Sequence, residues 1–202
     1  MRKAIGAAAL AAGMAMSGGA AGQEKLSMQL FHFNVQYVAG GTLGYWPTPD
    51  PALDLDNDAI EDLIIVESLE PVIDLLVAHP SWGADIEMQA YMLDIIADRH
   101  PELLAKIRDL AQSGQIDVLS FHYGDALFLG YPLEDWTRSQ ALTAERFAVH
   151  DVPLSTSVFC QEGQAAPMMA PRMQERGYEL LAWPKNLFRY QHGDEPAPPL
   201  YQ

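Results

Sequence analysis

The chain has 202 residues, of which 27 are acidic and 12 are basic, so its formal net charge is −15. A chain this acidic repels phosphate backbones and anionic lipid surfaces, which argues against nucleic acids and membrane surfaces as partners, whereas a neutral, hydroxyl-rich ligand meets no such repulsion. Cys160 is the only cysteine, which excludes a disulfide framework and a cysteine zinc cluster.

Residues 1–22 have the pattern of a cleaved secretory signal peptide. Arg2 and Lys3 precede an apolar, alanine-rich run at residues 4–16, and small neutral residues follow. The apolar run is shorter than the roughly 20 residues of a membrane span. We therefore expect a chain that starts near Gln23, is periplasmic or secreted, and has no membrane segment after cleavage. Its charge falls from −15 to about −17, because the segment holds two basic residues and no acid.

Residues 23–190 are predicted to form one domain in which strands alternate with helices. The predicted strands are 29–38, 84–90, 115–123, 154–160 and 179–184. The predicted helices include 59–79 with Asp58 as N-cap, one opened by His100-Pro101 and closed by Ser113-Gly114, 132–149 and 167–176. This alternation predicts a parallel sheet with right-handed crossovers. Five strands do not close a parallel barrel of seven or eight. We expect an incomplete parallel β/α barrel, followed at 191–202 by a Pro-rich tail or by the start of a continuation.

Carboxylates follow two of the predicted strands. Glu162 comes after the fourth strand and Asp125 after the third. The carboxyl ends of strands are where α/β barrels place their chemistry. The pair is therefore our catalytic candidate. The alternatives are a solvated glutamate and a loop or helix-capping aspartate.

Further polar and aromatic side chains are candidates for binding a ligand. His32, Asn34 and Gln36 alternate with Phe31 and Phe33 along the first strand, and polar side chains on one face of a core strand require a hydrated interior or a ligand. The alternative for His32 is a hydrogen-bonded core histidine.

The other binding candidates stand at the ends of later strands. His122 and Tyr123 end the third strand, and at most one of them faces inward. Trp183 ends the fifth strand and is the best placed tryptophan to stack on a sugar ring. The alternative for each is ordinary packing.

These features together resemble a known family. They are His32 on the first strand, the helix and strand from Pro101 to Val118 (PELLAKIRDLAQSGQIDV), the Glu162 strand, and Arg176-Gly-Tyr-Glu-Leu-Leu. The chain resembles the N-terminal catalytic barrel of glycoside hydrolase family 57 and, more distantly, family 38 α-mannosidases. The resemblance implies a seven-stranded barrel of the glycoside hydrolase/deacetylase type, with Glu162 as nucleophile and His32 at a sugar subsite.

The chain also departs from the pattern of these families. The first motif in family 57 is usually His-Gln-Pro, whereas this chain has His32-Phe33-Asn34, and the family's general acid has no counterpart that we can place. Family 38 holds a zinc ion partly by a first-strand His-x-Asp and a third-strand aspartate. This chain offers His32-x-Asn34 and Asp125, and an amide is a poor substitute for a charged zinc ligand. We therefore expect no metal and no other cofactor.

The resemblance implies an exported glycoside hydrolase-like protein that acts on α-linked oligo- or polysaccharides with retention. Glu162 would attack the anomeric carbon, and Asp125 or an acid beyond this chain would protonate the leaving oxygen. Two alternatives stay open: a non-catalytic or degenerate carbohydrate-binding barrel, and a metal-dependent enzyme similar to α-mannosidases or deacetylases.

Overall fold

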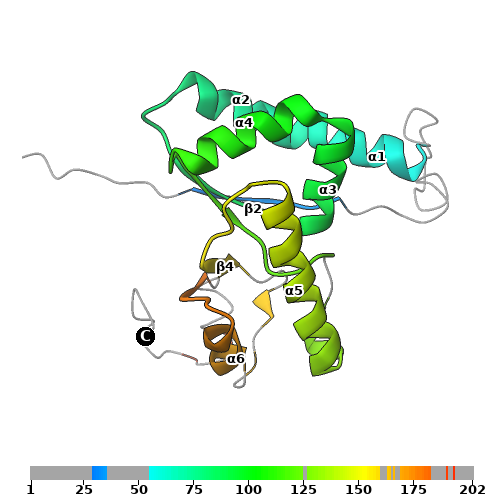
Figure 1. The fold of residues 1–202 in the computed structure, drawn as a ribbon, viewed down its shortest axis with the longest axis vertical. Helices are drawn as coiled ribbons and strands as arrows, with labels where there is room; N and C mark the ends of the chain where they lie inside the picture. The colour runs from blue at the N-terminus through cyan, green and yellow to red at the C-terminus, as the bar shows by residue number, and fades with distance from the viewer. Residues whose placement is uncertain are drawn as a thin grey trace, which may run out of the picture.

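The computed structural model describes residues 29–35, 55–124, 127–159, 163–164, 166, 169–182, 190 and 193. Within them, strands and helices follow one another in the alternation that the sequence predicts (Figure 1). The predicted signal peptide and, apart from residue 193, the Pro-rich tail lie outside the described residues.

Parallel strands form the centre of the fold. They are β1 (Leu30–Phe33), β2 (Ala84–Met88), β3 (Ile116–Leu119), β4 (Ser157–Phe159) and β5 (Leu180–Ala182). The first three pair in the order β1-β2-β3, and β4 pairs with β5. All of these pairings are parallel.

The two ladders are joined in sequence order. The backbone N–H of Ser155, just before β4, donates to the carbonyl of Val118 in β3 at 2.9 Å. The N–H of Glu179, just before β5, donates to the carbonyl of Thr156 at 2.8 Å. The strands therefore follow the sequential order of a β/α barrel. The described strands form part of such a fold and do not close a seven-stranded barrel.

Helices cover one face of the sheet. They are α1 (Asn57–Ile64), the π-helical turn η3 (Ile65–Leu69), α2 (Glu70–Ala78), α3 (Ala90–Arg99), α4 (Pro101–Gln112), the 3-10 turn η4 (Phe128–Gly130), α5 (Leu133–Val149) and α6 (Met169–Glu175). Figure 1 shows α1 to α4 together on one side of β2, with α5 running past the sheet and α6 near β4.

The main core lies between this helical layer and the sheet. Ile86 and Met88 are two residues apart on β2, so both point to the helical side, and both are fully buried. Ile65, Leu69 and Ile73 recur every four residues and bury one stripe of the helical segment from α1 to α2. A smaller apolar cluster around Phe121, Phe128, Trp136 and Val158 lies between the end of β3, α5 and β4.

Local signals set the helix ends. Pro101 begins α4 directly after His100 ends α3, and Gly114 has a φ of +75° just after α4, both as expected. The predicted N-cap at Asp58 is wrong. Asp56 caps α1 instead, because its carboxylate accepts from the N–H of Ala59 at 2.9 Å, and the helix therefore begins at Asn57.

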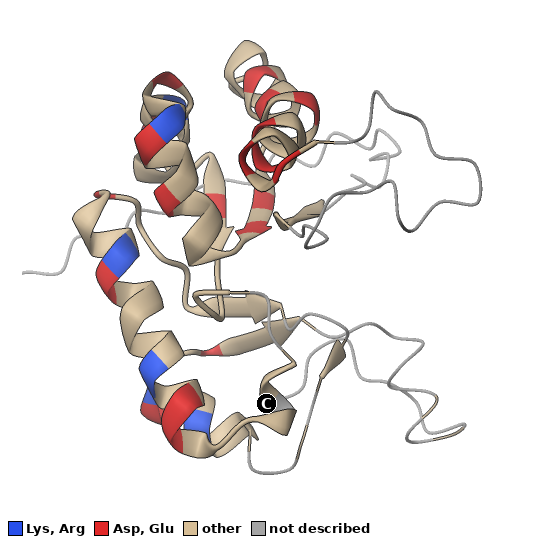
Figure 2. Cartoon of the chain, turned by 90° about the vertical axis from the view of Figure 1, so that its right-hand side faces the viewer, with Lys and Arg blue, Asp and Glu red and all other residues tan. Residues whose placement is uncertain are grey.

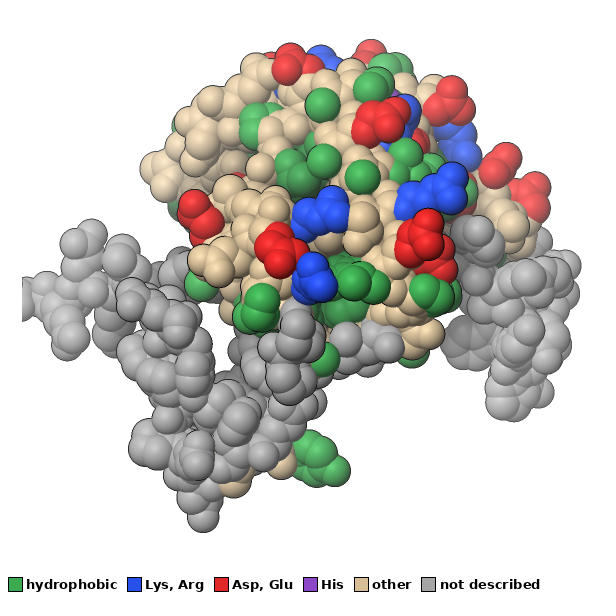
Figure 3. Space-filling view, turned by 60° about the horizontal axis from the view of Figure 1, so that its bottom comes forward, with side chains coloured by type: hydrophobic (Ala, Val, Ile, Leu, Met, Phe, Trp, Pro, Cys, Tyr) green, Lys and Arg blue, Asp and Glu red, His purple; other side chains and the backbone are tan. Residues whose placement is uncertain are grey.

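Several basic side chains on the helices are paired with acids of a neighbouring helix. Arg99 on α3 contacts Glu61 and Asp62 on α1, and Arg146 on α5 contacts Asp94 on α3. Figure 2 shows acidic residues spread over several helices, and on the face drawn in Figure 3 acidic, basic and hydrophobic side chains are interspersed.

No helix among the described residues is long and apolar enough to cross a lipid bilayer.

Candidate functional site

The sheet face opposite the helices carries polar side chains. His32 and Asn34 on and after β1 lie on this face, as the alternation with Phe31 and Phe33 predicts, and the Asn34 amide nitrogen is 3.2 Å from Nε2 of His32. Phe31 and Phe33 point to the helical side, where they pack against the main core. The predicted division of β1 into a polar and an apolar face is therefore confirmed as far as Asn34.

Glu87 on β2 is the partner of His32. The parallel register places the two residues opposite each other, and the Glu87 carboxylate contacts Nδ1 of His32. With the ring proton on Nδ1 directed at this carboxylate, Nε2 is left to accept from the Asn34 amide. The side chain of Glu87 is 9% exposed and that of His32 is 32% exposed. The buried carboxylate therefore sets the tautomer and orientation of a ring that reaches the surface.

Our sequence analysis missed Glu87. The signal was present, because Asp85, Glu87 and Gln89 alternate with Ile86 and Met88 in the same way that His32 and Asn34 alternate with phenylalanines. Without the register between the two strands, nothing in the local pattern singled out Glu87 among these three polar residues.

Gln89 and Phe159 complete the neighbourhood of His32. The buried Gln89 accepts from the backbone N–H of Val35 at 3.2 Å and so ties the end of β1 to β2. The ring of Phe159, the last residue of β4, has its centroid 5.6 Å from that of His32. This contact brings the two ladders to one shared interior at the carboxyl ends of β1 and β4, which is where β/α barrels place their sites.

A pair of carboxylates lies at the other end of the strands. Asp85 and Asp117 are opposite each other in the β2–β3 register, and Ser155 donates to Asp117 at 2.5 Å. Burial, with a contribution from the Asp117 charge, raises the pKa of Asp85. The pair stands near the amino ends of the strands, whereas β/α barrels place their active sites at the carboxyl ends.

The prediction that His122 and Tyr123 end the third strand is wrong: β3 ends at Leu119, and the two residues follow it with their side chains in different surroundings. The Tyr123 hydroxyl donates to Asp94 on α3 at 3.2 Å, and Asp94 also accepts from Arg146 at 2.7 Å. Burial and the Asp94 carboxylate raise the pKa of the Tyr123 hydroxyl. Tyr123 is thus held within a network of hydrogen bonds that joins α3 to α5.

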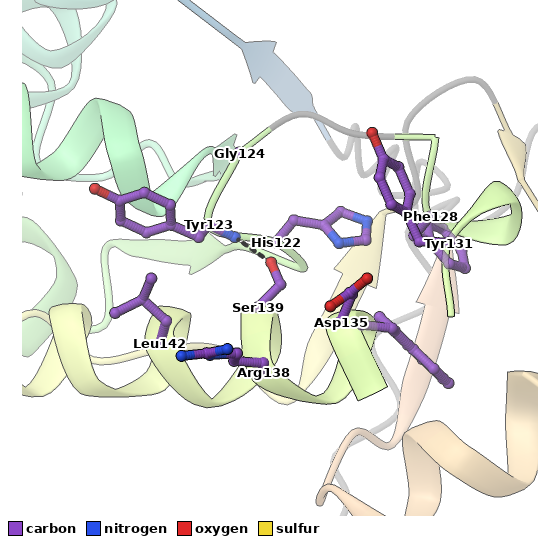
Figure 4. Close-up of a pocket in the computed structure, with 10 residues that line it drawn as sticks. His122, Tyr123, Gly124, Phe128, Tyr131, Asp135, Arg138, Ser139 and Leu142 are labelled. Carbon is purple, nitrogen blue, oxygen red and sulfur yellow. Dashed lines mark hydrogen bonds between the residues drawn. The ribbon is translucent and has the colours of Figure 1, made fainter. Parts of the chain in front are cut away.

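His122 lines a pocket together with its neighbours Tyr123 and Gly124 (Figure 4). The pocket has a volume of about 350 Å³ and is lined by the end of β3, the η4 turn and the first half of α5. The His122 ring packs between Phe121 and Phe128, with centroids 4.4 and 4.8 Å away. Burial lowers the pKa of His122 to about 4, so the ring is neutral at physiological pH.

Four of the predicted site residues, Gln36, Asp125, Glu162 and Trp183, lie outside the described residues. The structure therefore brings together His32 and Asn34, adds Glu87 to them, and places His122 in a separate pocket. Among the residues that the structure describes, no three His, Cys, Asp or Glu side chains are grouped so that they could hold a metal ion.

Comparisons with known proteins give a match in fold. No protein-family model matches the chain, and no curated protein matches it. A solved structure, that of 4-α-glucanotransferase from Thermococcus litoralis, matches with a TM-score of 0.61 at 16% sequence identity. The match covers 76% of this chain and 21% of that chain, so this chain spans about a fifth of the length of the protein it resembles. A similarity at this identity shows that the two share a fold.

Proposed function

We propose that this chain is an exported, glycoside hydrolase-like protein that acts on α-linked oligo- or polysaccharides with retention of configuration. The observation that carries the proposal is the polar inner face formed by His32, Asn34 and Glu87, in a chain that shares its fold with a 4-α-glucanotransferase. The resemblance of the sequence to glycoside hydrolase family 57 supports the same class of substrate.

The polar face suits a sugar because it offers oriented hydrogen bonds beside an apolar ring. His32 is held by Glu87, Asn34 adds an amide, and the Phe159 ring lies at the same place. Sugar hydroxyls both donate and accept, whereas the C–H bonds of a pyranose pack on aromatic carbon. In this proposal Gln36 extends the polar row, and Trp183 provides a further stacking surface.

Glu162 is the proposed nucleophile. It follows Phe159, the residue of β4 that meets His32, by three positions in the sequence. Its carboxylate attacks the anomeric carbon, the glycosidic C–O bond breaks, and Asp125 or another acid gives its proton to the leaving oxygen. The same acid, now a base, then takes a proton from water or from an acceptor hydroxyl, which releases the sugar and restores Glu162.

A matched pair of variants tests this mechanism. The full chain is incubated with maltooligosaccharides and an activated α-glucoside, and products are followed by chromatography. Glu162→Gln is expected to abolish turnover, whereas Glu145→Gln, an exposed substitution on α5, is expected to leave it unchanged. Unchanged turnover in Glu162→Gln would remove Glu162 from the mechanism.

Export with cleavage of the signal peptide is tested on the protein purified from the periplasm or medium. An N-terminus at Met1 instead of near Gln23 would contradict the proposed cleavage.

A second candidate function is binding of carbohydrate without catalysis. One observation favours it: both ring nitrogens of His32 already have protein partners, Glu87 and Asn34, as in a histidine that only maintains structure. Calorimetry separates the two functions. Binding of maltooligosaccharides by the wild-type chain, with no product after prolonged incubation, supports the non-catalytic barrel.

A further inference from the structure

Three polar side chains are linked by hydrogen bonds on the inner face of the sheet. The Glu87 carboxylate contacts Nδ1 of His32, and Nε2 of His32 lies 3.2 Å from the amide nitrogen of Asn34. Exposure increases along this series, because Glu87 is buried, His32 is partly exposed, and the hydrogen bond between His32 and Asn34 lies at an exposed position. A ligand on this face can therefore touch Asn34, whereas Glu87 acts on Asn34 through His32.

The carboxylate determines the direction of both hydrogen bonds. An ionised carboxylate only accepts, so Nδ1 of His32 carries the ring proton. A neutral imidazole has a single N–H, so Nε2 is an acceptor and the NH2 group of Asn34 donates to it. Oδ1 is the other branch of the same planar amide, and it is turned away from His32. Among the described residues, His32 is the one hydrogen-bond partner of the Asn34 side chain.

This arrangement limits what Asn34 offers to a ligand. An unconstrained asparagine amide can turn over and present either its donor group or its acceptor oxygen. If Asn34 turned over, Oδ1 would face the lone pair of Nε2 of His32, and two acceptors make no hydrogen bond. Asn34 therefore presents Oδ1. A site built around such an oxygen favours a ligand group that donates and rejects an analogue that only accepts.

We propose that Asn34 is a specificity-determining residue whose Oδ1 accepts a hydrogen bond from one sugar hydroxyl, and that Glu87 is a positioning residue that holds Asn34 in this orientation through His32. A sugar hydroxyl suits this site because it can donate to Oδ1 and still accept a hydrogen bond from another group. The inference rests on the proposed function for its class of ligand. It does not depend on Glu162 or on the catalytic step.

The first test determines which nitrogen of His32 is protonated in the ligand-free full chain at pH 7.5. Histidine ¹⁵N NMR distinguishes a protonated ring nitrogen from an unprotonated one, and His32→Gln assigns the His32 signals among those of the six histidines. We expect a proton on Nδ1 and none on Nε2. In Glu87→Met, which removes the acceptor of the Nδ1 proton, we expect the proton on Nε2, where it can bond to Oδ1 of a reversed Asn34 amide. A protonated Nε2 in the wild-type chain, or an unchanged tautomer in Glu87→Met, overturns the inference.

The second test measures binding by calorimetry with methyl α-maltosides in which fluorine replaces one hydroxyl at a time. Fluorine does not donate, so at one position we expect the substitution to weaken binding to the wild-type chain about tenfold, which corresponds to the loss of one hydrogen bond. At the same position it should have no effect in Asn34→Leu, which lacks the acceptor, and a reduced effect in Glu87→Met. Asn57→Leu is the matched control, because Asn57 is an exposed asparagine at the start of α1, on the helical side of the sheet (Figure 1). It should behave like the wild-type chain.

The outcomes separate this inference from the proposed function. If maltosides bind but no position distinguishes Asn34→Leu from Asn57→Leu, the role of Asn34 is refuted, and the proposed function still stands. If one position does distinguish them and no product forms, the role of Asn34 is supported in a barrel that binds sugar without catalysis. If no maltoside binds, the ligand class fails and both proposals are overturned.

Discussion

Replacing His122 by phenylalanine should remove a large part of the pH dependence of stability. The ring is 6% exposed, and burial lowers its pKa to about 4 in the folded chain, whereas the ordinary value is 6.5. As the pH falls, the unfolded chain therefore binds this proton first, and the free energy of unfolding decreases between pH 6.5 and pH 4. Above pH 6.5 His122 causes no loss of unfolding free energy, and below pH 4 the loss has reached its full size.

The size of this effect follows from the two pKa values. Their difference of 2.5 corresponds to about 3 kcal/mol in full, of which about 2 kcal/mol is already lost at pH 5. Phe fits the same place because the His122 ring packs between Phe121 and Phe128. The substitution thus removes the titrating group and retains the aromatic packing.

The assay is urea unfolding of the full chain followed by circular dichroism at pH 7.5 and pH 5.0. We expect the stability of His122→Phe relative to wild type to rise by about 2 kcal/mol between the two pH values. Other titrating groups, including Asp62 and Asp85, are common to both chains and cancel in the difference. The control Leu75→Phe alters an exposed, non-titrating side chain on α2, so its difference from wild type should be the same at the two pH values. Equal differences at the two pH values for His122→Phe would refute the assignment of His122 as a buried neutral base.

Two further predictions concern ion pairing and backbone conformation. Arg99→Met should destabilise the chain by about 3 kcal/mol, because Glu61, 2% exposed and 2.7 Å from the guanidinium, would be left buried without its cation. Adding Glu61→Gln should restore more than half of this loss in urea unfolding, and a double variant as unstable as Arg99→Met would contradict the explanation. Gly114→Ala should cost about 1–2 kcal/mol, because Gly114 has a φ of +75°, a strained value for alanine, although its surroundings leave room for a Cβ. Gly130→Ala, equally unobstructed and without a positive φ, is the control and should be close to neutral in thermal melts.

Local patterns predicted where strands and helices lie, but not their ends: the third strand, predicted over 115–123, is Ile116–Leu119 in the structure. The alternation around His32 predicts a strand with one polar and one apolar face, and the side chains of Asn34 and Phe33 lie on the faces expected. Pro101 and Gly114 mark the two ends of α4. Proline restricts φ to a helical value and glycine permits a positive φ, and both effects are local properties of the residue. The N-cap at Asp56 was missed because Asp56 and Asp58 are chemically equivalent, and only the helix geometry distinguishes them.

The functional residues depended on contacts between distant segments. Glu87 is the partner of His32 because the register of β1 against β2 places them opposite each other, although they are 55 residues apart in the sequence. The alternation of polar and apolar residues within each strand does not reveal which residues of the two strands lie opposite each other. The pocket of His122 exists because Phe128, which follows β3 in the chain, packs against its ring, and Trp136 in turn stacks on Phe128. The sequence by itself therefore determined which segments are strands and helices and which of their faces are polar. Both follow from the spacing at which apolar residues recur along each segment. Tertiary structure alone decided which polar side chains meet and which are left buried without a partner, because both depend on packing between elements.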